Sequence, residues 1–401
     1  MKKGFTLVEL LAVIVILAVI LVIAIPQVLK VVDNSRKSAY IKNEQMVENV
    51  AKTYLASNSG KAPANEGHIT IVALSQLQEN NLIGQIIDVK DKQTICTGYV
   101  LIINLGNNEY DYQPYLNCGE NYQTEGYTAE SIQEVEVLVV AGGGGSGGYG
   151  GGGGGAGGLI FDAGYNVTFF DSISISVGGG GNLRENGENT SFGTLIAVGG
   201  GHGGDGNNSS GRNGANGGSG GGGGHSSTVN TVGGIGIVGQ GYNGGNQWDT
   251  ENNTYPAAGG GGAGGTGSDA ENNIAGDGGE GVYYGNLFGE EYGENGWFAG
   301  GGGGHIWNGV SNGMGGKGGG GTGGVDNDEG NNSNGLTNSG GGAGGCDPRK
   351  CNFAPFGGSG IVLIRYPGPQ KANGGIVTTF NGYTIHAFTE VGESTFEVLE
   401  F

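Results

Sequence analysis

Glycine is the feature that most restricts what this chain can fold into. Eight of its 96 glycines precede Gly142 and five follow Gly360, so 83 lie within the 219 residues from 142 to 360. Each glycine loses roughly 0.5–1 kcal/mol more backbone entropy on folding than alanine does. Runs of this kind become ordered only within a dense network of compensating interactions, and disorder is the competing expectation.

Apolar islands between the glycine runs argue against disorder. In SISISV, Ile173, Ile175 and Val177 alternate with serine, which is the period of a half-buried strand. A flexible linker does not need such patterning, so we expect a β-strand frame. The other islands are VEVLVV (135–140), FGTLIAV (192–198), VNTVGGIGIV (229–238), VYYGNLF (282–288) and GIVLIRY (360–366).

The glycine runs between these islands have a regular structure available to them. Glycine-only stretches can form an extended helix like polyproline II, with ~3 residues per turn. Because glycine has no side chain and keeps its N–H group, neighbouring rods can pack closely and hydrogen-bond laterally. We therefore expect packed polyglycine-II-like rods, with VEVLVV and IVLIRY as central strands that hold the ends of the domain together.

Other glycine-containing motifs do not fit this sequence. A dinucleotide-binding G-x-G-x-x-G needs a helix directly after it, and here further glycine follows. A phosphate-binding P-loop needs Ser or Thr after its lysine, but Lys317 is followed by glycine. Collagen needs a strict G-x-y period and many prolines, and the chain has eight prolines.

The N-terminus, MKKGFTLVEL, leads into a long apolar run. From Phe5 to Ile25 the only polar residues are Thr6 and Glu9. In a helix this run spans about 31 Å, enough to cross a bilayer. A secretory signal peptide would have a shorter apolar core and an A-x-A cleavage site. A lone carboxylate in hydrocarbon costs at least a few kcal/mol, so Glu9 requires a partner.

KKGFTLVELL, with Pro26 further on, resembles the class III leader of type IV pilins and pseudopilins. The resemblance implies that a prepilin peptidase cuts after Gly4 and that Phe5 is N-methylated. It also implies that the Glu9 carboxylate meets the N-terminal amine of a neighbouring subunit, which would make a costly charge a device for register. The protein would reside in the cytoplasmic (inner) membrane before assembly and then in an extracellular filament.

The helix is expected to continue beyond the membrane, over residues 5–60, with a bend at Pro26, which lacks a backbone donor. Gly60 and Pro63 form a stop signal. Four residues share one helical face and predict packing against a soluble head. They are Tyr40, Val47, Ala51 and Tyr54.

Residues 61–126 predict a small head with a β-hairpin, in which CTGYVLIIN and EYDYQPYLNC flank the turn LGNN. Cys96 and Cys118 each lie eleven residues from Asn107, so they face each other where a disulfide can close the hairpin. Such a bond is worth about 3 kcal/mol. A zinc pair is the alternative, but no CxxC or histidine cluster accompanies it. Upstream, ITIVALSQLQENNLI resembles the short helix before the sheet of many pilins.

Residues 127–401 resemble a glycine-rich domain of secreted and phage-tail proteins, through VEVLVVAGGGG, GGSGIVLIRYPG and the closing NGYTIHAFTEVGESTFEV. Packed polyglycine rods also occur in phage tail-tip adhesins and in anaplastic lymphoma kinase-type receptors. The expected chain is therefore an α+β protein with a leader (1–4), a transmembrane and assembly helix (5–60), a pilin-like head (61–126) and a glycine-rich domain (127–401).

Aromatic residues set among Asn, Asp and Glu are the candidate ligand contacts. On loop tips they suit carbohydrate or protein recognition. The alternative is that they cap and pack the glycine layers, which have few other apolar side chains. The candidates are Trp248, Trp297, Trp307, Tyr242 and Tyr292.

No metal or cofactor is expected. His202, His225 and His305 follow glycine runs without a regular ligand spacing. GGTGSDAEN is one imperfect copy of a calcium-binding repeat that works only by stacking. CDPRKC favours a structural disulfide between Cys346 and Cys351 over redox chemistry.

The formal charge of −20 argues against nucleic acid as the main partner and suits a solvated exterior surface. No nucleophile, base and orienting group form a catalytic set, so we do not expect an enzyme. We expect a subunit of a surface filament that assembles with other pilins and displays an adhesive domain to a host glycan or protein. A domain of this size on every subunit would crowd a filament, which favours a minor or tip subunit. The alternative is a pseudopilin of a type II secretion or DNA-uptake machine, with the glycine-rich domain as a spacer.

We predict processing between Gly4 and Phe5, dependent on the small residue at the site. Mass spectrometry of the exported protein should then find Phe5 at the N-terminus. An intact Met1 terminus, or cleavage near Ala24, would contradict the pilin assignment.

Overall fold

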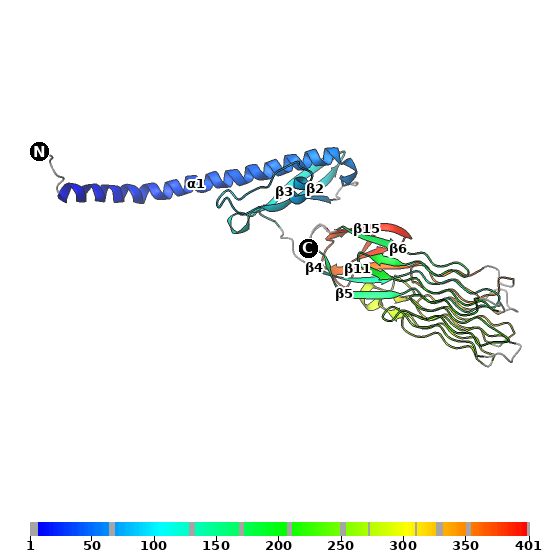
Figure 1. Ribbon diagram of the computed structural model, residues 1–401. Helices are drawn as coiled ribbons and strands as arrows, with labels where there is room; N and C mark the ends of the chain where they lie inside the picture. Colours follow the sequence, from blue (N-terminus) through cyan, green and yellow to red (C-terminus); the bar gives the residue numbers. More distant parts are fainter. Residues whose placement is uncertain are drawn as a thin grey trace. The chain divides into compact units, whose positions relative to one another are not determined.

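The computed structural model describes most of the chain, which divides into two compact units, residues 1–130 and 131–401. We describe each unit by itself (Figure 1). The described residues are 7–63, 69–127, 133–167, 172–206, 211–248, 254–271, 273–308, 311–325, 332–349 and 354–398.

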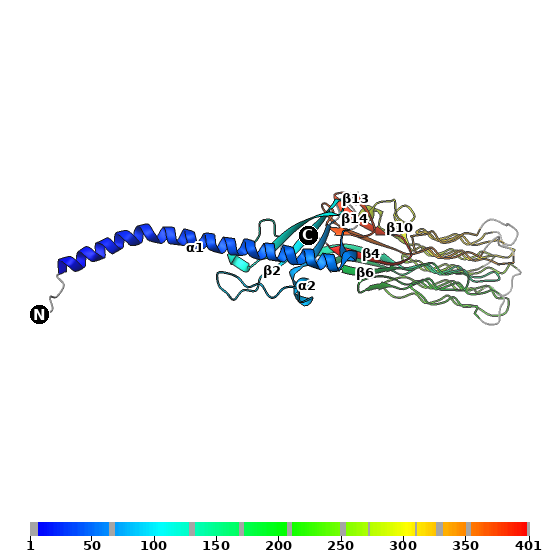
Figure 2. The same cartoon turned by 90° about the horizontal axis from the view of Figure 1, so that it is seen from above.

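The first unit is built on one long helix, α1 (Leu7–Ser57). The large apolar side chains described between Leu7 and Val32 are all exposed. Pro26 lies inside α1, and the helix continues through it; Figure 2 shows α1 curved in its N-terminal half. The long apolar helix is thus confirmed, whereas a bend caused by Pro26 itself stays a prediction.

A three-stranded antiparallel sheet packs against the C-terminal half of α1, in the order β1 (Ile69–Ala73), β2 (Thr97–Gly106), β3 (Glu109–Asn117). The expectation of helix over ITIVALSQLQENNLI is wrong for its first five and last four residues, because only Leu74–Glu79 forms a helix, α2. The β-branched run that precedes α2 pairs with β2 instead. The head is therefore a hairpin with a third strand added, and short 3-10 turns occur at Ser59–Lys61 and Gly119–Asn121.

The predicted hairpin and its disulfide are confirmed. Thr97 pairs with Asn117 at the open end, so Cys96 and Cys118 come within 4.2 Å between their Cα atoms and form a disulfide. At the turn, Asn107 and Asn108 have φ values of 54° and 63°, a left-handed conformation that asparagine tolerates well.

The predicted buried face of α1 forms one side of the head's core. Tyr40, Val47, Ala51 and Tyr54 are all buried. Apolar residues from α2 and the two hairpin strands cover this face. They are Leu74, Leu77, Val100, Ile102 and Leu116.

The second unit has a frame of two five-stranded sheets, in the orders β13-β14-β11-β4-β5 and β12-β15-β6-β7-β8. A small hairpin of β9 (Val282–Tyr283) and β10 (Trp297–Phe298) encloses the short helix α3 (Gly285–Phe288). The frame strands are β4 (Gln133–Val140), β5 (Leu159–Val167), β6 (Ser172–Val177), β7 (Thr190–Phe192), β8 (Leu195–Ala197), β11 (Ile361–Pro367), β12 (Ala372–Asn373), β13 (Ile376–Phe380), β14 (Tyr383–Phe388) and β15 (Gly392–Val398).

As expected, VEVLVV and IVLIRY are neighbouring central strands, β4 and β11. Alternate residues of β4 enter two separate apolar clusters, with Val137 and Val139 in one and Leu138 and Val140 in the other. Both faces of β4 are therefore buried, which explains its continuous apolar sequence.

An ion pair joins the same two strands near their outer ends. Arg365 lies opposite Glu136 and donates to both of its carboxylate oxygens, from Nε at 3.0 Å and from Nη2 at 2.8 and 2.9 Å. The remaining Nη1 donates to the Leu287 carbonyl at 2.9 Å.

Two apolar islands depart from the expected strands. VYYGNLF forms a strand only at Val282–Tyr283 and then the short helix α3. SISISV is β6, with Ile173, Ile175 and Val177 buried as its alternation predicted. VNTVGGIGIV, in contrast, makes only isolated bridges at Thr231 and Gly236. Four of its five apolar residues follow a period of three and are exposed, which neither a strand nor a buried core would produce. They are Val229, Val232, Ile235 and Val238.

The glycine segments extend away from the strand frame side by side (Figures 1 and 2). Residues 141–158 continue the β4–β5 pair in unbroken register as far as a turn at residues 148–150. Only every third residue of the outgoing segment donates to the returning one. The bonds are Ala141 N to Gly158 O (3.0 Å), Gly144 N to Gly155 O (2.9 Å) and Gly147 N to Gly152 O (3.1 Å).

The intervening N–H groups point to other segments, so one segment donates in three directions. The hydrogen bonds to a second neighbouring segment also repeat every three residues. A further N–H group donates to a third neighbouring segment. These bonds are Gly142 N to Glu188 O (3.1 Å), Gly145 N to Glu185 O (3.0 Å) and Gly143 N to Gly358 O (2.9 Å). A β-strand pairs in two directions with a period of two, so this arrangement is distinct from a sheet.

Asparagine side chains accept the lateral donors where the glycine array meets solvent. The amide oxygens of two flanking segments, again three residues apart, replace backbone carbonyls as acceptors. The bonds run from Val232 N to Asn213 (3.1 Å), Ile235 N to Asn216 (2.7 Å), Gly236 N to Asn243 (2.9 Å) and Gly233 N to Asn246 (3.1 Å). These asparagines therefore stabilise the fold by accepting backbone hydrogen bonds.

We predict that alanine is tolerated at some glycines of this unit and not at others. A Cβ atom on Gly154 would lie 2.1 Å from the Gly144 carbonyl oxygen, whereas one on Gly265 would be 3.8 Å from its nearest neighbour. Gly154→Ala should lower the free energy of unfolding by at least ~1–3 kcal/mol through overpacking. Gly265→Ala should be neutral or stabilise by about 0.4–1 kcal/mol. Thermal unfolding and hydrogen exchange of the two variants test this. Equal changes in stability for Gly154→Ala and Gly265→Ala would contradict the close packing.

Candidate functional site

The first candidate site is the N-terminal helix. Gly4 and Phe5 lie outside the described residues, and so does the side chain of Glu9, whose backbone belongs to α1. Within the described part of the chain, Leu10–Ser57 is the one helix long and apolar enough to cross a membrane, and its apolar window is 0% buried. A surface of this kind is suited to lipid or to other apolar helices.

Beyond this apolar stretch, polar contacts fix α1 to the head. The Tyr40 hydroxyl donates to Asp88 Oδ1 at 2.6 Å, and burial together with this bond raises the pKa of Tyr40 to about 12. The Tyr40 ring stacks on Tyr122 with ring centroids 4.1 Å apart. Tyr122 in turn donates to Glu44 of α1 at 2.8 Å. Two helix residues separated by one turn are thereby held by the head.

Asp88 is the buried acceptor in this network. Burial by itself would raise its pKa, but the hydrogen bonds from Tyr40, the Lys90 N–H group and the Asn121 amide outweigh burial and lower it. The ionised form is therefore stabilised in the folded state.

The five aromatic candidates do not form one site. Trp248 is 45% exposed, and its indole N–H donates to Asp269 Oδ2 at 2.8 Å. Tyr242 is 49% exposed on the same segment. These two side chains are accessible for contact, and a role in binding stays a prediction.

Two of the candidates make packing contacts, Trp297 within the small β9–β10 hairpin and Tyr292 against the strand frame. The half-buried Trp297 lies in β10 with its ring centroid 5.4 Å from that of Tyr283, and Lys317 Nζ is 5.4 Å from the Trp297 ring. Tyr292 packs on the apolar cluster beneath, and its hydroxyl is 3.1 Å from Thr378 Oγ1. Burial raises the pKa of Tyr292. These contacts favour the packing role that the sequence left open.

Trp307 belongs to a group of residues that the sequence analysis did not assemble. Tyr149 lies in the turn at residues 148–150, at the end of the glycine segments that emerge from β4 and β5. The guanidinium carbons of Arg184 and Arg349 lie over the Tyr149 ring, 5.1 and 5.2 Å from its centroid. Arg349 is also 5.7 Å from the Trp307 ring. We call Tyr149, Arg184, Trp307 and Arg349 the tip cluster.

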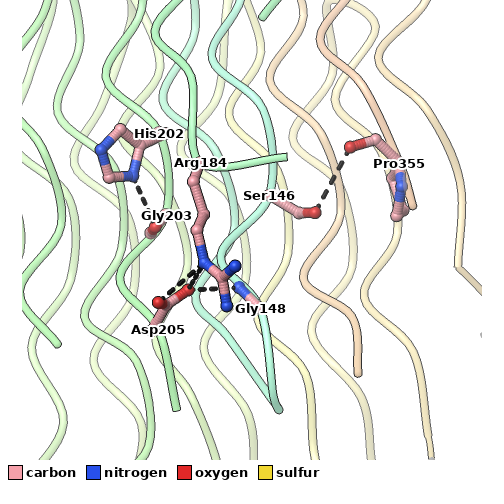
Figure 3. A network of polar contacts seen from close by, with 7 residues as sticks. All are labelled: Ser146, Gly148, Arg184, His202, Gly203, Asp205 and Pro355. Carbon is pink, nitrogen blue, oxygen red and sulfur yellow. Dashed lines mark hydrogen bonds and ion pairs between the residues drawn. The ribbon is translucent and has the colours of Figure 1, made fainter. Parts of the chain in front are cut away.

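Buried carboxylates hold both arginines of the tip cluster. Arg184 Nε is 2.7 and 2.8 Å from the two oxygens of Asp205, which also accepts the Gly148 N–H at 2.7 Å (Figure 3). Arg349 donates to both oxygens of Asp347, from Nε to Oδ1 at 2.9 Å and from Nη2 to Oδ2 at 2.5 Å. Burial opposes ionisation of Asp347, but Arg349 outweighs it and lowers the pKa of that carboxyl group.

A weak signal of this cluster was present in the sequence. Tyr149 is the one large side chain in the run from Gly142 to Gly158, in which every other residue is Gly, Ser or Ala. Nothing local identified its arginine partners, because they belong to distant segments.

The histidines have structural contacts. His202 Nδ1 is 2.8 Å from the Gly203 carbonyl (Figure 3). His225 is buried with Nδ1 3.0 Å from the Gly150 carbonyl, and burial lowers its pKa. Among the described residues there is no group of three or more His, Cys, Asp or Glu that could hold a metal ion.

Cys346 is buried and disulfide-bonded, and Cys351 lies outside the described residues. The predicted pairing of these two cysteines therefore remains a prediction.

Two family models match the chain, one over the glycine-rich part and one at the N-terminus. Residues 122–367 match the glycine-rich domain family, so the chain belongs to it. Residues 1–25 match the prokaryotic N-terminal methylation motif. This motif indicates a type IV pilin-like or pseudopilin subunit, and implies processing by prepilin peptidase and assembly with other pilins. It suggests a structural subunit rather than an enzyme. No curated protein and no solved structure matches the chain.

The Asp88 network predicts acid sensitivity of the head. Because the folded pKa of Asp88 lies below its unfolded value of about 3.9, its contribution to stability is present above that pH and is lost as pH falls through the folded pKa. Asp88→Asn should lower the free energy of unfolding by ~1–3 kcal/mol at pH 7 and weaken the acid dependence.

Hydrogen exchange in the head, measured from pH 7 to pH 3, would test this prediction. Glu120→Gln is the control, because it removes an exposed carboxylate of the same unit. If the two variants behave alike, Asp88 does not couple α1 to the head.

Proposed function

We propose that this protein is a minor or tip subunit of a type IV pilus-like filament. In this proposal α1 anchors the chain in the membrane and then enters the filament core, and the glycine-rich unit displays an adhesive end. The main support is an exposed apolar helix whose N-terminal part lies within a prepilin-type methylation motif, residues 1–25.

The helix supports assembly because its apolar side chains cannot stay in water. Outside the bilayer, the exposed residues from Leu7 to Val32 require cover, and the equivalent helices of other subunits can supply it. In this arrangement Phe5 is the methylated N-terminus, and Glu9 pairs with the amine of a neighbouring subunit. Pro26 lets the helix bend between filament core and head.

The glycine-rich unit supports display because a laterally bonded array is suited to present loops on a rigid base. We interpret its period-three hydrogen bonding as packed polyglycine-II-like rods, since three residues per turn aim successive N–H groups in three directions. The exposed Trp248 and Tyr242 and the half-buried Trp307 are candidate contacts to a host glycan or protein.

We further propose the division into leader (1–4), helix (5–60), head (61–126) and glycine-rich domain (127–401). Immunogold labelling of intact cells distinguishes the functional alternatives. Label at filament tips supports a displayed adhesin, whereas label confined to the cell envelope supports a pseudopilin with a glycine-rich spacer.

We predict that Glu9→Ala inserts into the membrane but fails to assemble. The substitution removes a charge from the apolar span, which favours insertion. It also removes the partner of an incoming N-terminal amine, and an unpaired buried charge costs about 3–5 kcal/mol, so incorporation should fall by at least roughly tenfold.

Comparison of sheared filaments with membrane fractions measures this loss. Glu48→Ala on the same helix is the matched control, because its partly exposed pair with Lys52 is worth little. Normal incorporation of Glu9→Ala would remove the assembly role of Glu9.

A further inference from the structure

The tip cluster, defined above as Tyr149, Arg184, Trp307 and Arg349, brings together four residues from widely separated parts of the chain. Its position at a turn, rather than within the glycine array, leaves its side chains partly accessible: Tyr149 is 38% exposed. The inner segments have almost no side chains, so this end concentrates the side-chain chemistry that the array lacks.

The backbone at this cluster is held in a costly conformation. Tyr149 and Arg184 have φ values of 56° and 63°, in the left-handed region that bulky side chains seldom adopt. Such a conformation is unfavourable for a residue other than glycine and persists only where its surroundings impose it. Both residues are thereby fixed with their side chains beside each other, 5.1 Å from guanidinium carbon to ring centroid.

The two arginines are oriented by buried carboxylate partners and are themselves partly exposed to solvent. The Asp205 and Asp347 side chains are only 9% and 0% exposed, whereas those of Arg184 and Arg349 are 40% and 54% exposed. A ligand approaching from solvent therefore meets guanidinium groups rather than carboxylates. Because both side chains are already immobilised, binding to them sacrifices little further rotamer entropy.

The distribution of arginine adds to this asymmetry. Residues 131–401 contain four arginines, and Arg365 is committed to Glu136 in the strand frame. Arg184 and Arg349 belong to the tip cluster, and Arg212 donates to the hydroxyls of Ser226 and Thr228, at 2.9 and 3.3 Å. Two of the four arginines of this unit therefore lie in the tip cluster, each paired with a buried carboxylate.

We propose that the tip cluster binds the carboxylate of an acidic glycan, such as one with uronic or sialic acid residues. The inference rests on the proposed adhesive function and names its ligand class. Planar guanidinium groups recognise carboxylates through paired hydrogen bonds, and the partly exposed aromatic side chains of Tyr149 and Trp307 can give the sugar ring an apolar contact. Duplex DNA fits less well, because its binding requires a series of phosphate contacts along an extended basic surface.

The test uses the detergent-solubilised full chain and immobilised oligosaccharides with uronic or sialic acid, together with the same oligosaccharides after carboxyl reduction. The wild-type chain should bind the acidic forms and lose at least about tenfold in affinity for the reduced ones. Arg184→Lys and Arg349→Lys keep the charge next to each aspartate but lose the planar fork, so each should weaken binding of the acidic forms by about tenfold.

Lys317→Gln is the matched control, because it removes a cation from beside Trp297 in the β9–β10 hairpin, outside the tip cluster. It should bind like the wild-type chain. Thermal unfolding of each variant confirms that the fold is intact.

Equal binding of acidic and reduced oligosaccharides would overturn the proposal. Normal binding by both arginine variants would also overturn it and leave the arginines as supports of the turns. Binding of duplex DNA in place of the acidic sugars, lost in the same variants, would replace the glycan with a phosphate ligand. Filament incorporation and cell adhesion, measured in parallel, report on the proposed function separately.

Discussion

The lateral backbone hydrogen bond is the interaction on which the second unit depends. Each inner glycine segment passes its N–H groups to neighbours on several sides, and those neighbours lie so close that a single Cβ atom would collide with a carbonyl oxygen. The hydrogen bonds offset the large backbone entropy of glycine, and the absence of side chains permits the spacing that the bonds need. The glycine content and the close packing therefore require each other.

Side chains in this unit are consequently confined to its margins. At the frame, β4 and β11 join the two ends of the domain with apolar residues on both faces and with the Arg365–Glu136 pair. Along the outer segments, asparagine amides end the lateral bonding. At the turns, Tyr149 and its arginines occupy space that the array does not fill. Side chains able to bind a ligand therefore have to lie at these margins, and the tip cluster is one such group.

The first unit meets a different requirement, since one helix must suit two environments. Its N-terminal half exposes apolar side chains over its whole described surface, as a membrane or filament core demands. Its C-terminal half has one buried stripe and is secured by Tyr40 and Glu44 through polar contacts to the head. The change between the two surfaces occurs along a continuous helix, so in the proposed assembly the head would remain attached as the apolar half leaves lipid for the filament core.

The sequence by itself determined the features that depend on local pattern: the apolar helix, its buried face, the hairpin with Cys96 opposite Cys118, and the pairing of VEVLVV with IVLIRY. Residues 69–73 were misassigned because their strand character depends on β2, a partner distant in the chain. VNTVGGIGIV was misassigned because its period of three belongs neither to helix nor to strand. Only the tertiary structure placed Tyr149 between Arg184 and Arg349, because no local period links a turn residue to side chains on other segments, and lateral packing alone brings them into contact.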